Sequence, residues 1–239
     1  MRAYIPILLL LIAQALTQSA WAQTPNPKQP GLKQFELVYR FTLNGQYLGK
    51  VTDTFKREGA HYQLTSIARP EGKLAMLLPT LTLSSQGELR KRQFAPARFS
   101  QSRSNAPEKT AVADFDWQQS VLTHAYKGNS QSMPLPAQTL DALTQLYSFT
   151  QMDKLPDHLE LPITNGRKLM RYRYKRQPAE QIEAALGTFE SVEYRRIASA
   201  DENAISVWIA PALNHLPLRI RVREDTGVFE QQLVEINFN

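Results

Sequence analysis

Short runs of alternating apolar and polar residues constrain the fold of this chain more than any other feature. Residues 35–43 place Phe, Leu and Tyr side chains in alternation with polar ones, which is the period of a half-buried strand. Asn44-Gly45 follows, and both residues tolerate the positive φ of a type I′ turn. We therefore expect residues 46–55 to return as the partner strand of an antiparallel hairpin.

Further short strands are expected along the chain, because Gly, Pro, Asn and Ser clusters divide it at short intervals. In the first half they cover residues 61–68, 80–85, 88–94, 97–102, 110–117 and 120–126. In the last third, alternating segments include residues 170–175 and 216–223, and Asp225-Thr226-Gly227 turns the chain into a final strand that ends near Phe238. Many short strands with close turn signals indicate antiparallel β-structure.

Three segments depart from this pattern. Residues 138–152 carry leucines and aromatic residues at helical spacing, with Thr139 as a possible N-cap, and they predict one amphipathic helix. Residues 74–78 fit a short helix or a buried strand, and residues 178–186 have a helix-favouring composition between two strands, so both stay open. The predicted fold is mainly β: a strongly curved antiparallel sheet or open β-barrel with one covering amphipathic helix.

The first 22 residues have the organisation of a secretory signal peptide. Arg2 precedes an apolar run that is shorter than the roughly 20 residues needed to span a bilayer, and Ala20-Trp21-Ala22 forms a small-x-small cleavage site before Gln23. Residues 1–22 are thus expected to be removed, residues 23–34 to form a flexible linker, and residues 35–239 to form a single β-rich domain. No later run reaches spanning length, so no transmembrane segment is expected after processing.

The chain contains no cysteine, which excludes disulfides and the lipid-bearing cysteine of a bacterial lipoprotein. A leader of this type on a cysteine-free chain suits the periplasm of a Gram-negative bacterium. The formal net charge is +6, and export makes nucleic acid an unlikely source of the matching negative charge. The candidate partners are therefore anionic lipid, lipopolysaccharide or an envelope protein.

Two basic strands supply the candidate ligand-binding residues. Each predicted strand turns one face to the core and a row of cations outward, and the two rows would merge if the strands were neighbours. Guanidinium groups suit phosphate and carboxylate recognition, whereas an ordinary solvated sheet face is the alternative. The candidates are Arg171, Arg173, Arg219 and Arg221, with Tyr172 and Tyr174.

The sequence carries no catalytic motif. It lacks His-Glu-x-x-His, Gly-x-Ser-x-Gly and glycine-rich phosphate loops, and its four histidines are widely spaced, so no metal site, cofactor or catalytic residue is predicted. Asp114 and Asp116 share one strand face and leave a hydrolase open as an alternative, provided that a histidine such as His124 or His215 converges with them.

Several segments, in the order in which they occur along the chain, resemble an exported bacterial family known as domain of unknown function 3108. Together they span most of the chain after the leader, and they are Ser84-Ser85-Gln86-Gly87, Phe94-Ala95-Pro96-Ala97-Arg98-Phe99, Asp114-Phe115-Asp116-Trp117, Leu140-Asp141-Ala142-Leu143-Thr144-Gln145-Leu146-Tyr147, Gly187-Thr188-Phe189, Trp208-Ile209-Ala210-Pro211 and Leu216-Pro217-Leu218-Arg219. The resemblance implies a periplasmic, mainly antiparallel β domain and brings no established activity.

These observations favour a non-enzymatic binder or chaperone of an amphiphile or a cell-envelope component. The alternatives are a structural or interaction protein with a packed barrel, and a hydrolase that uses Asp114 and Asp116. An open apolar cavity would favour the binder, and a packed interior would favour the interaction protein.

Overall fold

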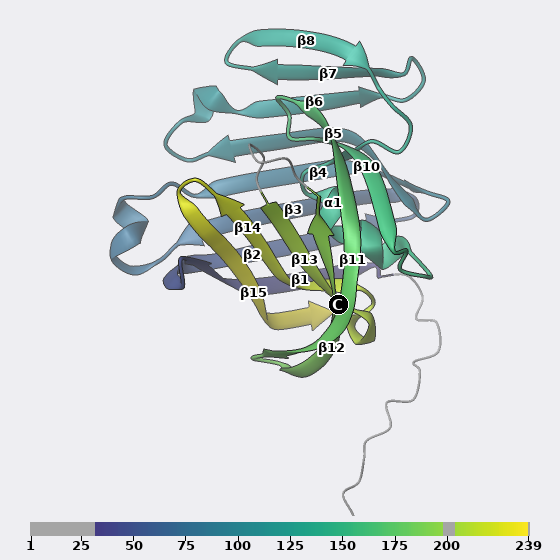
Figure 1. Ribbon diagram of the computed structural model, residues 1–239. Coiled ribbons are helices and arrows are strands. Elements are labelled where there is room, and N and C mark those ends of the chain that lie inside the picture. Colours follow the sequence, from purple (N-terminus) through teal and green to yellow (C-terminus); the bar gives the residue numbers. More distant parts are fainter. Residues whose placement is uncertain (1–31, 198–203, 239) are drawn as a thin grey trace, which may run out of the picture.

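A single sheet of 15 strands dominates the structure, a computed structural model that describes residues 32–197 and 204–238 (Figure 1). The strand order is β8-β7-β6-β5-β4-β3-β2-β1-β15-β14-β13-β12-β11-β10-β9. Neighbouring strands are antiparallel, apart from the parallel pair β9 and β10. The terminal strands β8 and β9 are not neighbours, so the curved sheet is open. This confirms the predicted class, a mainly β fold built on a curved, open antiparallel sheet.

The first half of the sheet is a meander. It contains β1 (Gln34–Leu43), β2 (Gln46–Glu58), β3 (His61–Pro70), the 3₁₀ helix η1 (Gly72–Met76), β4 (Leu81–Arg90), β5 (Gln93–Arg103), the 3₁₀ helix η2 (Pro107–Lys109), β6 (Ala111–Asp116), β7 (Val121–Tyr126) and β8 (Asn129–Pro134). Strand β8 was not expected from the sequence, because its side chains are polar and mostly exposed.

The second half returns to the first strand and closes against it. It contains β9 (Leu140–Asp141), α1 (Thr144–Tyr147), the 3₁₀ helix η3 (Ser148–Gln151), β10 (His158–Thr164), β11 (Leu169–Ala184), β12 (Gly187–Arg196), β13 (Ala204–Ala210), the 3₁₀ helix η4 (Pro211–Leu213), β14 (Leu216–Glu224) and β15 (Gly227–Phe238). Strand β15 pairs with β1, which joins the two halves in the middle of the sheet.

The first hairpin forms as predicted. Asn44 has a φ of 50° and Gly45 a φ of 80°, and Leu43 pairs with Gln46 across the two-residue turn. The open segments are also settled: residues 72–76 form a 3₁₀ helix, and β11 continues through residues 178–184 as a strand.

The two strands expected over residues 80–94 are wrong in their boundaries. The chain continues as β4 through Gly87, where the register with β5 shifts by a bulge. A Cβ atom on Gly87 would lie 2.3 Å from the Ala95 carbonyl oxygen, so glycine permits a close backbone approach there and does not end the strand. The turn lies instead at Lys91-Arg92, both of which have positive φ.

The helix expected over residues 138–152 is much shorter than predicted. Only Thr144–Tyr147 is α-helical, and η3 continues it. The Asp141 carboxylate caps the turn by accepting the N–H groups of Leu143 at 2.9 Å and Thr144 at 2.8 Å, whereas the Thr139 hydroxyl donates to the Pro136 carbonyl. Most side chains of this segment are buried, so it lies against the concave side of the sheet.

Aromatic side chains fill the space between α1 and the strands. Phe35 stacks on Phe55 with ring centroids 5.0 Å apart and on Tyr147 of α1 at 5.4 Å. Phe149 of η3 packs on Tyr194 of β12 at 4.6 Å. The centre of the sheet's concave side is therefore a packed core, which explains why one polar-capped turn of helix is stable there.

The predicted leader and most of the predicted linker lie outside the described residues. Leu32 packs against the core, and the Lys33 carbonyl accepts a hydrogen bond from the Arg57 N–H, so these two residues of the predicted linker are part of the packed domain. Within the described residues, no helix combines the length and apolar composition that crossing a membrane requires.

Candidate functional site

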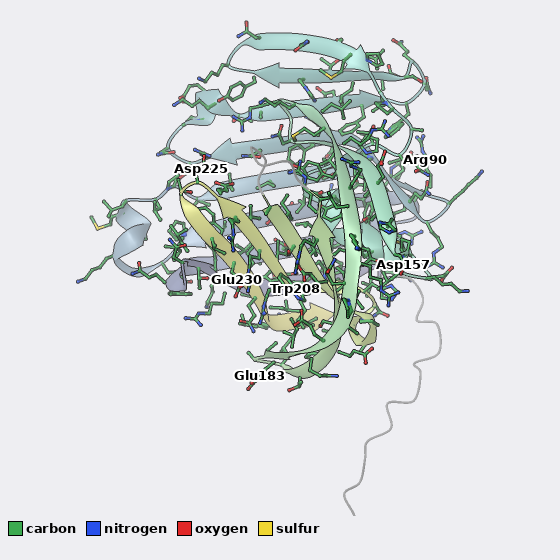
Figure 2. The ribbon with its side chains drawn as sticks, viewed as in Figure 1. Arg90, Asp157, Glu183, Trp208, Asp225 and Glu230 are labelled. Carbon is green, nitrogen blue, oxygen red and sulfur yellow. The ribbon has the colours of Figure 1, made fainter. Side chains whose placement is uncertain are left out.

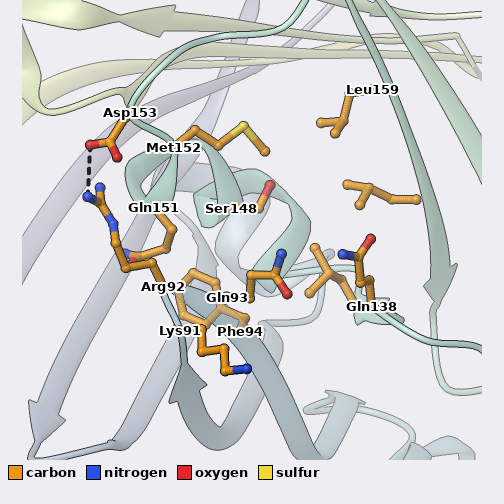
Figure 3. Close-up of a pocket in the computed structure, with 12 residues that line it drawn as sticks. Lys91, Arg92, Gln93, Phe94, Gln138, Ser148, Gln151, Met152, Asp153 and Leu159 are labelled. Atoms are coloured by element: carbon orange, nitrogen blue, oxygen red, sulfur yellow. Dashed lines mark hydrogen bonds and ion pairs between the residues drawn. The ribbon is translucent and has the colours of Figure 1, made fainter.

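A cavity of about 330 Å³ lies at one end of the molecule, beside the turn between β4 and β5 (Figure 3). Strand β9 lies against β5, but the two strands are not paired by backbone hydrogen bonds. Side chains therefore set the distance between them. The cavity opens along this seam. Its lining comes from β5, β9, η3, β10 and the connections beside them: Lys91, Arg92, Gln93, Phe94, Gln138, Leu140, Ser148, Gln151, Met152, Asp153, Leu159 and Leu161.

One wall of the cavity is apolar. Phe94, Leu140 and Leu161 are buried members of the core, and Met152 and Leu159 pack against that core from the partly exposed side. The apolar wall is thus continuous with the packed interior. It can accept a hydrocarbon or aromatic group that leaves water.

The rim of the cavity is polar and carries two cations. Lys91 and Arg92 form the β4–β5 turn, and the Arg92 guanidinium lies 2.8 Å from the Asp153 carboxylate at one side of the cavity (Figure 3). Among the described residues, Lys91 forms no ion pair. The rim therefore carries a net positive charge above an apolar wall.

The backbone of this turn is unusual for its side chains. Lys91 has a φ of 48° and Arg92 a φ of 63°, and Arg90 pairs with Gln93 around them. Asn-Gly occupies the equivalent turn between β1 and β2, where the left-handed conformation carries little penalty. Lys and Arg adopt it at a cost of about 1–2 kcal/mol each, and such strain tends to collect at functional sites.

Behind the cavity, buried carboxylates hold α1 in place. Asp141 accepts a hydrogen bond of 2.6 Å from the Ser85 hydroxyl of β4, and the Tyr147 hydroxyl donates to Asp53 of β2. Burial raises the pKa of Asp53 to about 6 and also raises the pKa of Asp141, while hydrogen bonds to their carboxylates oppose the shift. Their partners come from the protein interior, so we assign these carboxylates to the support of the site.

The residues of the hydrolase alternative do not converge. Asp114 lies 2.5 Å from Arg98, and Asp116 accepts the N–H groups of Gln118 and Gln119 in the following turn. His124 is buried on the opposite face and contacts the Thr164 hydroxyl at 2.7 Å. The Nδ1 atom of His215 lies 3.2 Å from the Phe149 carbonyl oxygen. Burial lowers the pKa of both His124 and His215.

The predicted basic strands are not neighbours. Arg171 and Arg173 lie on β11, whereas Arg219 and Arg221 lie on β14, and β12 and β13 separate the two strands. The condition for one merged patch, that the two strands be adjacent in the sheet, is therefore not met. Local alternation does not determine strand order, which is a property of the whole sheet.

Two carboxylates form ion pairs with three of the four arginines. Arg171 pairs with Glu160 at 2.6 Å, and Glu230 holds Arg221 at 2.6 Å and Arg219 at 4.0 Å. Tyr172 and Tyr174 point to the opposite, buried side, where the Tyr174 hydroxyl donates to Gln145 at 2.9 Å. The ligand-binding role of these six residues stays a prediction.

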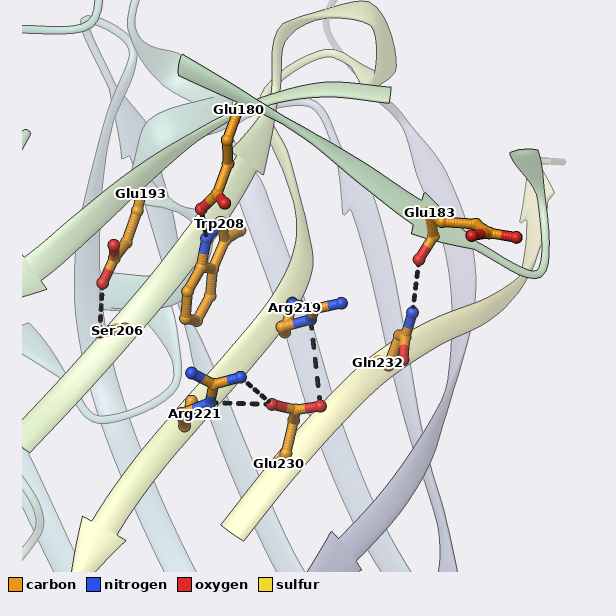
Figure 4. A network of polar contacts seen from close by, with 9 residues as sticks. All are labelled: Glu180, Glu183, Glu193, Ser206, Trp208, Arg219, Arg221, Glu230 and Gln232. Atoms are coloured by element: carbon orange, nitrogen blue, oxygen red, sulfur yellow. Dashed lines mark hydrogen bonds and ion pairs between the residues drawn. The ribbon is translucent and has the colours of Figure 1, made fainter. Parts of the chain in front are cut away.

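The guanidinium groups of the two candidate arginines on β14 lie over the ring of Trp208. The guanidinium carbons of Arg219 and Arg221 lie 5.6 Å and 5.1 Å from its ring, and its indole N–H donates to Glu180 at 2.5 Å (Figure 4). Gln232 also donates to the Glu183 carbonyl at 2.8 Å. The far part of the β11–β12 hairpin thus folds over the outer side of β13–β15, where Glu180 holds Trp208 and the Glu183 carbonyl holds Gln232.

The cavity itself was not predicted from the sequence. Its residues come from segments that are far apart in the chain, and none carries a motif. The one local signal was the run Arg90-Lys91-Arg92, because three consecutive cations interrupt an otherwise continuous alternation. In the absence of Gly or Asn they did not indicate a turn.

The architecture is that of a barrel-like β protein: an open curved sheet packed around a central helical turn, with a cavity at one end. The chain belongs to the family described as "Protein of unknown function (DUF3108)", which matches residues 34–234 and confirms the resemblance. Curated proteins give no match to the chain.

Two solved structures are similar in fold. A β-barrel-like protein of the family DUF1849 from Brucella abortus has a TM-score of 0.55 and 9% sequence identity, over 88% of this chain and 99% of that one. A putative exported protein with a YmcC-like fold from Bacteroides fragilis has a TM-score of 0.31 and 9% identity, over 87% of this chain and 97% of that one. The first supports the barrel-like fold alone.

Proposed function

We propose that this protein is a non-enzymatic binder of a small anionic amphiphile in the periplasm. The observation that carries the proposal is the end cavity, in which an apolar wall lies beneath a turn of two cations held in the left-handed conformation. The apolar group of the ligand would contact Phe94, Leu159 and Leu161. Its carboxylate, sulfate or phosphate would face Lys91 and Arg92.

The volume limits the size of the ligand. About 330 Å³ lies at the lower end of the range of roughly 300–1,000 Å³ that is typical of small-molecule sites. A single acyl chain or a small aromatic amphiphile fits this range better than a whole phospholipid. Residues 1–22 support the proposed compartment, because their organisation is that of a cleaved signal peptide.

Calorimetric titration with dodecanoate tests the proposal. Dodecanoate should bind the wild-type chain more tightly than dodecyltrimethylammonium does, since the rim is cationic. Leu159→Trp should fill the cavity and weaken dodecanoate binding by about tenfold or more, whereas Leu159→Met should bind like the wild type. Equal affinity for the two detergents, or full binding by a folded Leu159→Trp variant, would contradict the proposal.

A structural or interaction protein is the second candidate, and the packed core around α1 favours it. In that case the cavity would be a packing gap. The same titrations separate the two, because an interaction protein has no reason to prefer dodecanoate to its cationic counterpart.

A further inference from the structure

The end of the molecule away from the cavity carries an apolar loop and a group of cations. Strands β3, β5 and β7 run in one direction because their neighbours are antiparallel, so their carboxyl ends lie together. The turn between β4 and β5, which borders the cavity, lies at the other end. Arg90, beside that turn, and Asp225 mark the two ends in Figure 2.

The apolar loop is the η1 loop, residues 71–80 between β3 and β4. It projects beyond the sheet in Figure 1. Met76 is 91% exposed, Leu77 75% and Leu78 39%. Lys73 and Met76 lie on η1, and Leu77 and Leu78 follow it. The other large apolar side chains that are exposed among the described residues are not consecutive in the chain: Tyr47, Leu186, Ile197 and Phe238. Three adjacent apolar side chains in water point to an interaction surface.

A cation cluster lies beside this loop, and it consists of Arg103, Lys109, Lys127 and Arg167. Three of these residues line a concavity of about 70 Å³ together with Tyr126: Arg103 from β5, Lys109 from η2 and Arg167 from the β10–β11 turn. The Arg167 guanidinium carbon and the Lys127 ammonium nitrogen lie 5.3 Å and 5.4 Å from the Tyr126 ring centre.

The cluster lacks compensating negative charge. No carboxylate lines the concavity, and none of the four cations forms an ion pair within the described residues. Glu108 neighbours Lys109 on η2 but does not line the concavity, and Glu71 at the start of the η1 loop accepts from Tyr47 at 2.6 Å and lies 4.0 Å from Lys50. The cations are therefore available to an external anion.

The η1 loop and the cation cluster are parts of one surface. Arg103 pairs with Leu81 at the start of β4, and the Thr80 carbonyl at the end of the loop accepts the Ser104 N–H at 2.9 Å. The loop therefore leaves the sheet beside the strand that carries Arg103. Apolar side chains next to uncompensated cations match the interfacial region of an anionic bilayer, where acyl chains lie below phosphate groups.

We propose that this end of the molecule docks onto anionic phospholipid, with Met76, Leu77 and Leu78 inserted among the acyl chains and the cation cluster on the headgroup phosphates. Docking uses none of the cavity residues. It would leave the cavity at the opposite end accessible while the protein is on the membrane.

Vesicle co-sedimentation tests the docking. The assay uses the chain from Gln23 onward, since an uncleaved leader would itself enter lipid, and this chain keeps every described residue. At low salt it should bind vesicles of phosphatidylglycerol and phosphatidylcholine but not vesicles of phosphatidylcholine alone. Salt of about 1 M should weaken the binding, because it shortens the screening length to about 3 Å.

Two variants separate the apolar and the ionic contributions. Met76→Ser/Leu77→Ser and Arg103→Gln/Lys109→Gln/Arg167→Gln should each lower the affinity for anionic vesicles by at least about tenfold. The matched controls, Leu186→Ser and Lys33→Gln/Lys56→Gln/Lys175→Gln, change exposed residues elsewhere and should bind like the wild type. A single Leu77→Trp variant should also be quenched by brominated lipid.

Several results would overturn the docking proposal. These are no binding of the wild type at low salt, unchanged binding by either variant, an equal loss in the controls, or no quenching of Leu77→Trp. Leu159→Trp should keep full vesicle binding, and Met76→Ser/Leu77→Ser should keep full dodecanoate binding. Failure of the docking is thereby distinguished from failure of the cavity.

Discussion

The Tyr147 hydroxyl donates a hydrogen bond to the Asp53 carboxylate, and this contact ties α1 to β2 inside the fold. Both side chains are almost completely buried. The second carboxylate oxygen of Asp53 makes no hydrogen bond within the described residues. A buried carboxylate with an unsatisfied oxygen prefers its neutral form, which makes the support of the helical turn sensitive to pH.

The stability of the wild type should depend on pH through Asp53. Because burial raises the pKa of Asp53 to about 6 in the folded protein, its contribution to stability is fully present below the unfolded pKa near 4 and is lost as the pH rises through 6. Asp53→Asn should remove this dependence and raise the free energy of unfolding at pH 7 by up to about 3 kcal/mol. Denaturant unfolding of both proteins between about pH 4 and pH 8 measures the difference. A constant difference across this range would show that Asp53 does not titrate there.

The turn beside the cavity should trade stability for binding. Lys91→Asn/Arg92→Gly places a turn-forming pair where both residues have positive φ, and it should raise the free energy of unfolding by about 1 kcal/mol or more. The exposed Arg92–Asp153 ion pair is lost, but such pairs contribute only about 0–1 kcal/mol. Dodecanoate binding should weaken in the same variant. A variant that is less stable, or that binds as well as the wild type, would count against the functional reading of this turn.

The local pattern predicted those parts of the fold in which one strand face is buried. The alternation of Tyr172 and Tyr174 with cations gave the correct buried face of β11, and Asn44-Gly45 gave the correct turn. Period-two patterns are reliable there because burial on one face is a local property of a strand.

The rest of the fold depended on contacts between distant segments. The strands predicted over residues 80–85 and 88–94 imply a turn at Gly87, which instead lies within β4, close to the Ala95 carbonyl. Leu143 and Tyr147 do follow the spacing of a helix, yet Asp141 and the surrounding strands shorten it to one α-helical turn. The cavity also depends on contacts between distant segments, because it forms where β5 meets β9 and β10.

Gly87 should be more sensitive to substitution than Gly45. A Cβ atom at Gly87 would meet backbone atoms of β5 at 2.3 Å, whereas nothing lies within 4 Å of the same atom at Gly45. Gly45→Ala should cost about 1 kcal/mol through its positive φ alone, and Gly87→Ala should cost more because the backbone must move. Thermal unfolding of the two variants compares them. Equal losses would show that the bulge is not tightly packed.

The ion pairs that Glu230 and Glu160 form with arginines should differ in their contribution to stability. Glu230 is partly buried and contacts both Arg219 and Arg221, whereas Glu160 and Arg171 are largely exposed. Glu230→Gln should lower the free energy of unfolding by about 1 kcal/mol, and Glu160→Gln should have no measurable effect. Chemical denaturation provides the comparison. A larger loss in Glu160→Gln would contradict the assignment.

Native mass spectrometry of the protein purified from the periplasm tests the central claim most directly, because it detects a ligand that the cell itself supplies. The wild type and Leu159→Met should carry a bound anionic amphiphile, and folded Leu159→Trp should be free of it. A wild-type protein that is always unliganded and gains no dodecanoate when it is added, or a ligand that remains on Leu159→Trp, would contradict the assignment of the cavity as a binding site.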